Sequence, residues 1–136
     1  MSLPIDHINR YVSNVDKFIA FYESVLCYKL IARGKKYNGT RYAILKGLGQ
    51  ELFISEKEDF NIQIENVRHI GYSVDNADKT LEQLKDKGYA ETHQQVIVKP
   101  YSRQIYIRDP DGMEIDLIQW TDKQGFYDSL KIDEEV

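Results

Sequence analysis

An internal repeat is the feature of this sequence that most constrains its fold. Residues 7–14 (HINRYVSN) and residues 69–76 (HIGYSVDN) share His, Ile, Val and Asn at the same positions, 62 residues apart. A second pattern, glycine followed four residues later by a carboxylate and then by leucine, occurs at Gly47 and recurs at Gly112, 65 residues further on. Two repeated patterns in the same order indicate a duplicated unit. A unit of this kind cannot bury its own sheet and is expected to pack against its copy. Each half therefore carries a histidine early and a carboxylate late.

Both halves are expected to follow the order strand, helix and three strands. In the first half, Asn14 offers a helix cap, and apolar residues recur at helical spacing from Val15 to Leu26. In the second half, Asn76 offers the cap and Gly88 ends the helix. Strands are predicted at residues 5–12, 28–33, 42–45 and 51–55, and again at residues 67–74, 89–98, 103–108 and 113–119.

The predicted fold class is therefore α+β, with two βαβββ modules at about 5–56 and 67–119. The modules are expected to form a curved mixed sheet that has a concave cleft on one side and the helices on the outside. Residues 56–66 form a polar linker, and residues 120–136 form a tail that either docks as a short helix or frays. Because 136 residues suit one core of ordinary size, residues 1–136 are predicted to be a single domain.

Composition excludes several classes of function. A net charge of −4 without a basic stripe argues against nucleic acid as a partner, and no apolar run is long enough to span a membrane. The single cysteine, Cys27, ends an apolar helical pattern, so we expect it to pack in the core rather than to react. One cysteine cannot form an internal disulfide, which suits a cytoplasmic protein.

Strand parity places the repeated histidines and carboxylates on one side of the sheet. Side chains alternate along a strand, so His7 lies opposite Ile8 and Val12, which suit packing under a helix. The same alternation is expected in three other strands, where the polar residues His69, Glu51, Glu114 and Asp116 oppose the apolar residues Ile70, Leu52, Ile115 and Leu117. The polar face would then be the inner, concave one.

Two imidazoles and two carboxylates on that face, from His7, His69, Glu51 and Asp116, are a plausible set of ligands for one divalent ion. With water in the remaining positions, this set suits Ni²⁺, Zn²⁺, Mn²⁺ or Fe²⁺. A single histidine on a strand is more often structural than a ligand, but the repeat favours a pair of ligands. His93 has no counterpart in the repeat, and we expect no metal-binding role for it.

At this point the chain resembles the vicinal oxygen chelate superfamily, which includes glyoxalase I, fosfomycin-resistance proteins, bleomycin-resistance proteins and extradiol dioxygenases. The segments that carry the resemblance are Asp6–Ile8 with Asn14–Tyr22, His69–Asp75 and Ile107–Gly112. The resemblance extends to about Gln119 and is specific for the fold. It is weak for the reaction, because this superfamily hosts isomerases, transferases, dioxygenases and metal-free binders.

The resemblance implies the same four metal ligands, because the family's two metal histidines, its glyoxalase-type glutamate and its last carboxylate fall on His7, His69, Glu51 and Asp116. Asp116 departs from the family pattern, which has the longer glutamate there, and Glu114 on the same face is the alternative ligand. Arg10 is a second departure, since relatives carry an apolar residue at that position. We expect its stem to lie along the helix and its guanidinium to reach solvent.

The implied function is that of a divalent-metal-dependent enzyme, favouring a lactoylglutathione lyase-like isomerase or lyase. The ion would bind vicinal oxygens of a small-molecule substrate, and Glu51 or Asp116 would move a proton. Retention of all four ligand positions favours this reaction over a fosfomycin-type thiol transferase, which generally has a hydroxyl residue where this chain has Asn9. That transferase, an iron dioxygenase and a metal-free, bleomycin-resistance-like protein that sequesters a drug or metabolite remain alternatives. The resemblance also implies a homodimer.

Overall fold

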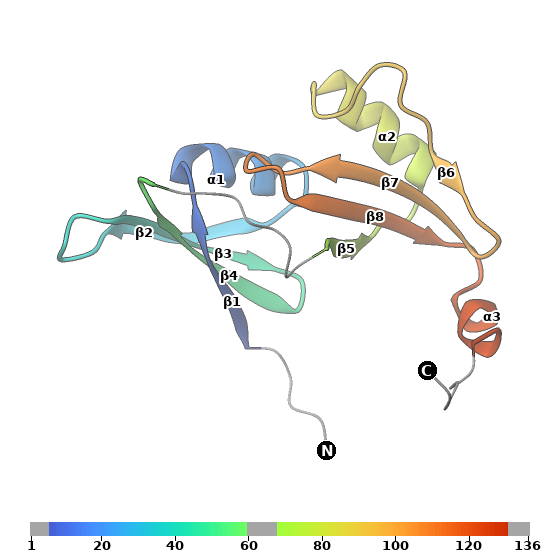
Figure 1. Ribbon diagram of the computed structural model, residues 1–136, viewed down its shortest axis with the longest axis horizontal. Helices are drawn as coiled ribbons and strands as arrows, with labels where there is room; N and C mark the ends of the chain where they lie inside the picture. Colours follow the sequence, from blue (N-terminus) through green and yellow to red (C-terminus); the bar gives the residue numbers. More distant parts are fainter. Residues whose placement is uncertain (1–5, 60–67, 131–136) are drawn as a thin grey trace. The chain divides into compact units, whose positions relative to one another are not determined.

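The computed structural model describes residues 6–59 and 68–130, and within them both predicted modules are present (Figure 1). Each module makes its own four-stranded mixed sheet with a helix after its first strand. The predicted α+β class with two βαβββ modules is therefore confirmed. Most of the predicted linker, the first residue of each predicted module and the last six residues of the tail lie outside the described residues. The single domain and the concave cleft stay predictions.

The first module runs β1 (His7–Val12), α1 (Val15–Ser24), β2 (Lys29–Lys35), β3 (Arg41–Gly47) and β4 (Gln50–Glu56). Its sheet has the order β1-β4-β3-β2, in which β1 pairs with β4 in parallel and the other pairs are antiparallel. The side chain of Asn14 caps α1 by accepting a hydrogen bond from the backbone N–H of Lys17 at 3.0 Å. The helix buries one stripe of residues at helical spacing, namely Val15, Phe18, Ile19, Phe21 and Tyr22.

The second module runs β5 (Ile70–Ser73), α2 (Ala77–Asp86), β6 (Ile97–Val98), β7 (Ser102–Arg108) and β8 (Glu114–Trp120), and α3 (Lys123–Asp128) follows. Its sheet has the order β5-β8-β7-β6, with β5 parallel to β8, so the first and last long strands pair as they do in the first module. Asn76 caps α2 through Lys79 at 3.1 Å, which repeats the cap of α1. The two asparagines of the sequence repeat thus have the same structural role.

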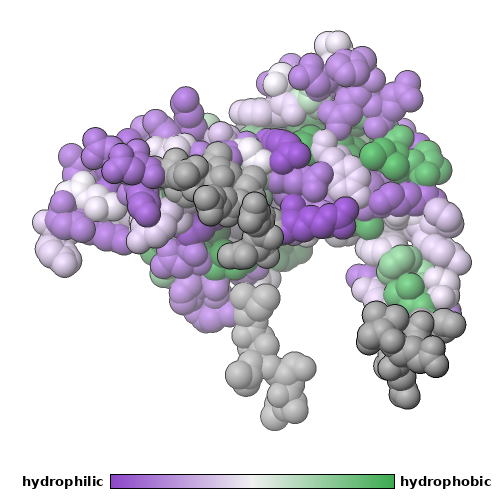
Figure 2. All heavy atoms as spheres, in the orientation of Figure 1, coloured by the Kyte–Doolittle hydropathy of each residue, from purple (hydrophilic) through white to green (hydrophobic). Residues whose placement is uncertain are grey.

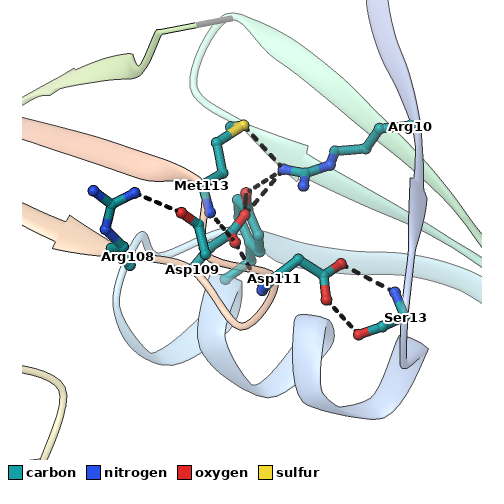
Figure 3. A network of polar contacts seen from close by, with 8 residues as sticks. Arg10, Ser13, Arg108, Asp109, Asp111 and Met113 are labelled. Carbon is teal, nitrogen blue, oxygen red and sulfur yellow. Dashed lines mark hydrogen bonds and ion pairs between the residues drawn. The ribbon is translucent and has the colours of Figure 1, made fainter. Parts of the chain in front are cut away.

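The chain forms two compact units, and one short segment belongs to a different unit from the residues on both sides of it. Residues Arg108–Met113 belong to the first unit, while residues on both sides of them belong to the second. The predicted tight turn lies here: Gly112 has φ of 85°, and the carboxylate of Asp109 accepts from the N–H groups of Asp111 and Met113. Asp111 in turn accepts hydrogen bonds from the backbone and the hydroxyl of Ser13 (Figure 3).

Two expectations for the second module are resolved by the structure. The strand predicted at residues 89–98 is only Ile97–Val98, because residues 91–95 are all polar and offer no alternating apolar face. The tail docks as α3, where Phe126 packs near Trp120 with ring centroids 5.2 Å apart. Figure 2 shows hydrophobic surface over β6 and around α3, and Ile97, Val98 and Leu130 are among the exposed large apolar residues. No helix within residues 6–59 and 68–130 is long and apolar enough to cross a membrane.

Two predictions for the first module are wrong. Cys27 is exposed rather than packed in the core, because it follows α1 in a left-handed conformation with φ of 57° that turns the chain, so that the N–H of Tyr28 meets the carbonyl of Tyr22. The guanidinium of Arg10 does not reach solvent. Its side chain is 17% exposed and pairs with the fully buried carboxylate of Asp109, a partner that lies far along the sequence (Figure 3).

Candidate metal-binding site

The first pair of predicted ligands, His7 and Glu51, lies on neighbouring parallel strands. The two residues are direct partners in the register of β1 and β4, so their side chains share one face of the sheet. The burial pattern of β1 supports this face: His7, Asn9 and Tyr11 are exposed, while the residues between them are half-buried or buried. The predicted alternation of β1 is confirmed.

The ring of His7 is held by two neighbours. It stacks on Phe53 with ring centroids 4.5 Å apart, and its Nδ1 donates to Oδ2 of Asp6 at 2.8 Å. A carboxylate on one ring nitrogen is the usual way to orient a metal-binding histidine and to make its other nitrogen more basic. Nε2 of His7 is therefore the atom available to a ligand.

Glu51 is a half-buried carboxylate on the same face. Within the described part of the chain, its side chain has no hydrogen bond or ion pair to another residue. Lys46 lies opposite Glu51 in the register of β3 and β4, so a cation lies near this carboxylate without forming an ion pair at 4.0 Å or less. Such a carboxylate is free to bind an ion or to accept a proton.

The second pair, His69 and Asp116, lies at the start of β5 and in β8. Nε2 of His69 is 3.9 Å from Oδ2 of Asp116, and Nδ1 of His69 is 3.5 Å from Oε2 of Glu114. In both histidines a carboxylate lies beside Nδ1, namely Asp6 in the case of His7 and Glu114 in the case of His69. Asp116 lies beside the other nitrogen of His69, Nε2, and the Nε2 of His7 is the one that is available to a ligand.

Two buried atoms at this second pair lack hydrogen-bond partners. Among the side chains in residues 6–59 and 68–130, only Nδ1 of His69 and Oδ1 of Asp116 are both fully buried and without such a partner. An unsatisfied buried polar group typically costs about 1–3 kcal/mol, so such atoms are rare in native proteins. A divalent ion bound by both side chains is a partner that would account for the unsatisfied carboxylate oxygen of Asp116.

The donor geometry also suits a divalent ion. Two donors on one such ion, each at about 2.0–2.2 Å, are separated by about 3–3.5 Å. The 3.9 Å between Nε2 of His69 and Oδ2 of Asp116 is slightly longer, so a small movement of either side chain would let one ion bind Nε2 and the Asp116 carboxylate. The nitrogen and oxygen donors are those that Zn²⁺, Mn²⁺, Ni²⁺ and Fe²⁺ accept.

The four predicted ligands occur as two pairs, one in each compact unit. In the described residues, no three His, Cys, Asp or Glu side chains are grouped closely enough to hold an ion by themselves. His93, for which we expected no metal-binding role, is exposed on the segment between α2 and β6.

Sequence reasoning missed a line of polar side chains next to Asp116. Gln104 of β7 donates from Nε2 to Oδ2 of Asp116 at 2.6 Å and to the hydroxyl of Tyr106 at 3.2 Å. Lys99 donates to the same hydroxyl at 3.1 Å, and the Tyr106 ring lies 6.1 Å from that of His69. The signal in the sequence is the alternation from Ser102 onward, in which polar residues alternate with Ile105 and Ile107, the apolar side chains of β7.

With the fold and this geometry established, comparison with known proteins gives a clear result. The family model described as "Glyoxalase/Bleomycin resistance protein/Dioxygenase superfamily" matches residues 4–117. The chain belongs to this superfamily. The resemblance deduced from the sequence is therefore confirmed.

Curated relatives of this glyoxalase-superfamily chain include two kinds of enzyme. A metallothiol transferase FosB from Lysinibacillus sphaericus is 28% identical over 132 residues, covering 94% of this chain and 92% of the relative. A lactoylglutathione lyase from Salmonella typhimurium is 31% identical over 124 residues, covering 85% of this chain and 92% of the relative. The superfamily is thus shown, and the two kinds of relative leave the reaction to be argued from the site.

Solved structures share the fold at lower identity. A glyoxalase/bleomycin resistance protein/dioxygenase domain from Frankia has a TM-score of 0.74 at 18% identity, covering 94% of this chain and 99% of that one. The fosfomycin resistance protein FosX from Listeria monocytogenes, complexed with Mn(II) and a sulfate ion, has a TM-score of 0.70 at 22% identity, covering 93% of this chain and 99% of that one. The fold therefore occurs in a protein that binds a divalent ion.

Proposed function

We propose that this chain is a divalent-metal-dependent enzyme with a lactoylglutathione lyase-like isomerase or lyase activity. His7, Glu51, His69 and Asp116 together hold one ion, so that the two modules act as a single domain. The observation that carries the proposal is the buried Oδ1 of Asp116, which has no hydrogen-bond partner and belongs to a carboxylate beside Nε2 of His69. The 31% identity to a lactoylglutathione lyase supports this choice of reaction.

In this proposal the ion supplies Lewis acidity toward two adjacent oxygens of the substrate. The chain's own residues orient the ligands and move the proton. Asp6 and Glu114 orient the two imidazoles through their Nδ1 atoms. Glu51 takes a proton from one substrate carbon and returns it to the neighbouring carbon, because, of the two proposed carboxylate ligands, it is the one that no other described side chain holds.

The proposed substrate is a small molecule with vicinal oxygens, such as the hemithioacetal that methylglyoxal forms with a thiol. The proposed form is a homodimer in the cytoplasm. A protein of net charge −4 has no general attraction for nucleic acid or for an anionic membrane surface, so neither is proposed as a partner.

A thiol transferase is the second candidate, and a specific contact favours it. The ring of Tyr106 lies 6.1 Å from that of His69, and the Tyr106 hydroxyl accepts a hydrogen bond from the Lys99 ammonium group. This pair suits an anionic oxygen group on a substrate. A metallothiol transferase is also among the relatives. Fosfomycin with a thiol is therefore the second substrate to assay.

Metal content of tag-free protein, measured by mass spectrometry after dialysis against Ni²⁺, Zn²⁺, Mn²⁺ or Fe²⁺, tests the proposal. We expect about one ion per chain in the wild type and in the control His93→Ala, and loss of the ion in His69→Ala with an unchanged circular dichroism spectrum. Metal-loaded protein should then isomerise the hemithioacetal, and Glu51→Gln should lose that activity. No ion in the wild type, or equal metal in His69→Ala, would refute the metal site and favour the metal-free binding protein.

A further inference from the structure

Gln104 is the one side chain among the described residues that donates a hydrogen bond to Asp116, the last proposed ligand. Its amide nitrogen lies 2.6 Å from Oδ2 of Asp116, and the two side chains are almost completely buried, with residue exposures of 6% and 5%. A hydrogen bond to a carboxylate in such surroundings is strong, because little water competes for the oxygen. Oδ2 therefore has a fixed partner, while Oδ1 has none.

The Gln104 amide has hydrogen-bond partners on both sides. The hydroxyl of Ser102 donates to Oε1 of Gln104 at 3.0 Å, and Ser102 is 5% exposed. If the amide were flipped, Oε1 would face the Asp116 carboxylate and the contact would become repulsive. The Asp116 carboxylate, which can only accept, thus selects the orientation in which the amide N–H groups point toward it and toward the hydroxyl of Tyr106, and the Ser102 hydroxyl donates to the oxygen on the other side.

This arrangement answers a question that the sequence leaves open. Asp116 has a shorter side chain than the glutamate usual at this position, and Glu114 is a competing ligand. Gln104 holds Asp116 so that a single oxygen, Oδ1, remains without a partner, whereas Glu114 lies beside Nδ1 of His69. We propose that Gln104 is a positioning residue that makes the Asp116 carboxylate, rather than Glu114, the last metal ligand. This inference rests on the metal site proposed above.

The size of the effect can be estimated from other metal sites. Removal of a hydrogen-bonding partner of a metal ligand typically weakens metal binding by about 10–100-fold. Gln104→Leu removes the amide and keeps a side chain of similar volume. We expect the dissociation constant of metal-stripped protein for Mn²⁺ to rise by about 10–100-fold in this variant. Gln95→Leu, at an exposed position of the same unit, is the matched control and should bind like the wild type.

A double-mutant cycle separates positioning from a general structural effect. If Gln104 acts through Asp116, Gln104→Leu will not further weaken the residual Mn²⁺ binding of Asp116→Ala, which is measured at high Mn²⁺ concentration because the carboxylate is absent. The measurement is the free Mn²⁺ signal in electron paramagnetic resonance during titration, which needs no enzyme activity. An unchanged constant in Gln104→Leu, or the same loss in both backgrounds, would overturn the inference.

Two further outcomes are informative. If Gln104→Leu loses its circular dichroism spectrum, Ser102→Ala replaces it, because this variant keeps the amide and removes only its anchor. A several-fold weaker constant is then expected, and wild-type binding by Ser102→Ala would contradict the inference. If the wild-type protein binds none of Mn²⁺, Ni²⁺, Zn²⁺ or Fe²⁺, the proposed function itself is refuted. If the wild type binds an ion and the variants bind it equally well, only the inference about Gln104 is refuted.

Discussion

Nη1 of Arg10 lies 3.0 Å from Oδ2 of Asp109, although the two residues are 99 positions apart in the sequence (Figure 3). The same guanidinium nitrogen donates to the hydroxyl of Tyr22 at 3.3 Å, and the guanidinium carbon lies 5.1 Å from the centroid of the Phe18 ring. The ion pair therefore joins β1, α1 and the Arg108–Met113 segment within the first unit. It accounts for a polar residue at a strand position where an apolar one is expected.

Replacing Arg10 leaves the buried Asp109 carboxylate without its cation. Removal of one partner of a buried ion pair typically costs about 3–5 kcal/mol, because the remaining charge is desolvated and unpaired. We expect Arg10→Met to lower the free energy of unfolding in urea by that amount. Arg33→Met is the control, since Arg33 pairs with Asp16 at the surface, and it should cost no more than about 1 kcal/mol. Equal losses in the two variants would contradict the structure.

Ionisation of Tyr22 makes the free energy of unfolding of the first unit depend on pH in the alkaline range. Burial raises the pKa of this tyrosine above its ordinary value of about 10, and the Asp109 carboxylate adds to the effect. The unfolded chain therefore loses this proton near pH 10 while the folded chain keeps it, so the stability linked to Tyr22 is complete below about pH 10 and decreases above it.

Tyr22→Phe removes this dependence. At about pH 8 the variant should be less stable by about 1 kcal/mol, because it lacks the hydroxyl that bonds to Asp109 and Arg10. The difference from the wild type should shrink as the pH rises toward about 11 in urea unfolding experiments. Tyr37→Phe, at a fully exposed position, should follow the wild type throughout. A constant gap between Tyr22→Phe and wild type would show that Tyr22 ionises equally well in both states.

The spacing of apolar residues and the internal repeat predicted most of the architecture, because both can be read directly from the sequence. Alternation in His7–Val12 indicated the exposed face of β1, and Asn14 and Asn76 indicated both helix caps. The shared face of His7 and Glu51 followed from the parity of two strands that each carry a polar residue, whereas their direct pairing is a finding of the structure. Each of these inferences needs only neighbours in sequence or the second copy of the repeat.

What the sequence did not predict depends on contacts that are distant in sequence. Arg10 was expected to reach solvent because nothing near it in the chain indicates a buried carboxylate. Gln104 is an ordinary polar residue of a strand until β7 lies beside β8 and its amide meets Asp116. Cys27 was assigned to the core from helical spacing, yet the helix ends before it and the backbone adopts positive φ.

The backbone at Cys27 provides a stability prediction. Its φ of 57° is a conformation that glycine adopts without strain and that costs other residues about 1 kcal/mol. Because Cys27 is exposed, its side chain contributes little packing that glycine would lose. We expect Cys27→Gly to raise the free energy of unfolding by about 0.5–1 kcal/mol. Cys27→Ala is the control, as it removes the thiol and keeps the strained conformation, and it should give no gain. Stabilisation by Ala as large as that by Gly would assign the effect to the thiol.

The proposed site makes a sharp distinction between two carboxylates two residues apart in β8. Oδ1 of Asp116 is buried without a hydrogen-bond partner, whereas Glu114 lies 3.5 Å from Nδ1 of His69, where it can orient the ring. Asp116→Asn should therefore remove nearly all bound metal, measured as ions per chain by mass spectrometry after dialysis. Glu114→Gln should keep the site and weaken its affinity by about 10-fold, in the range found for groups that orient a ligand. Both substitutions preserve shape and remove one negative charge, so charge alone predicts equal effects. The reverse order of the two losses would make Glu114 the last ligand and Asp116 its support.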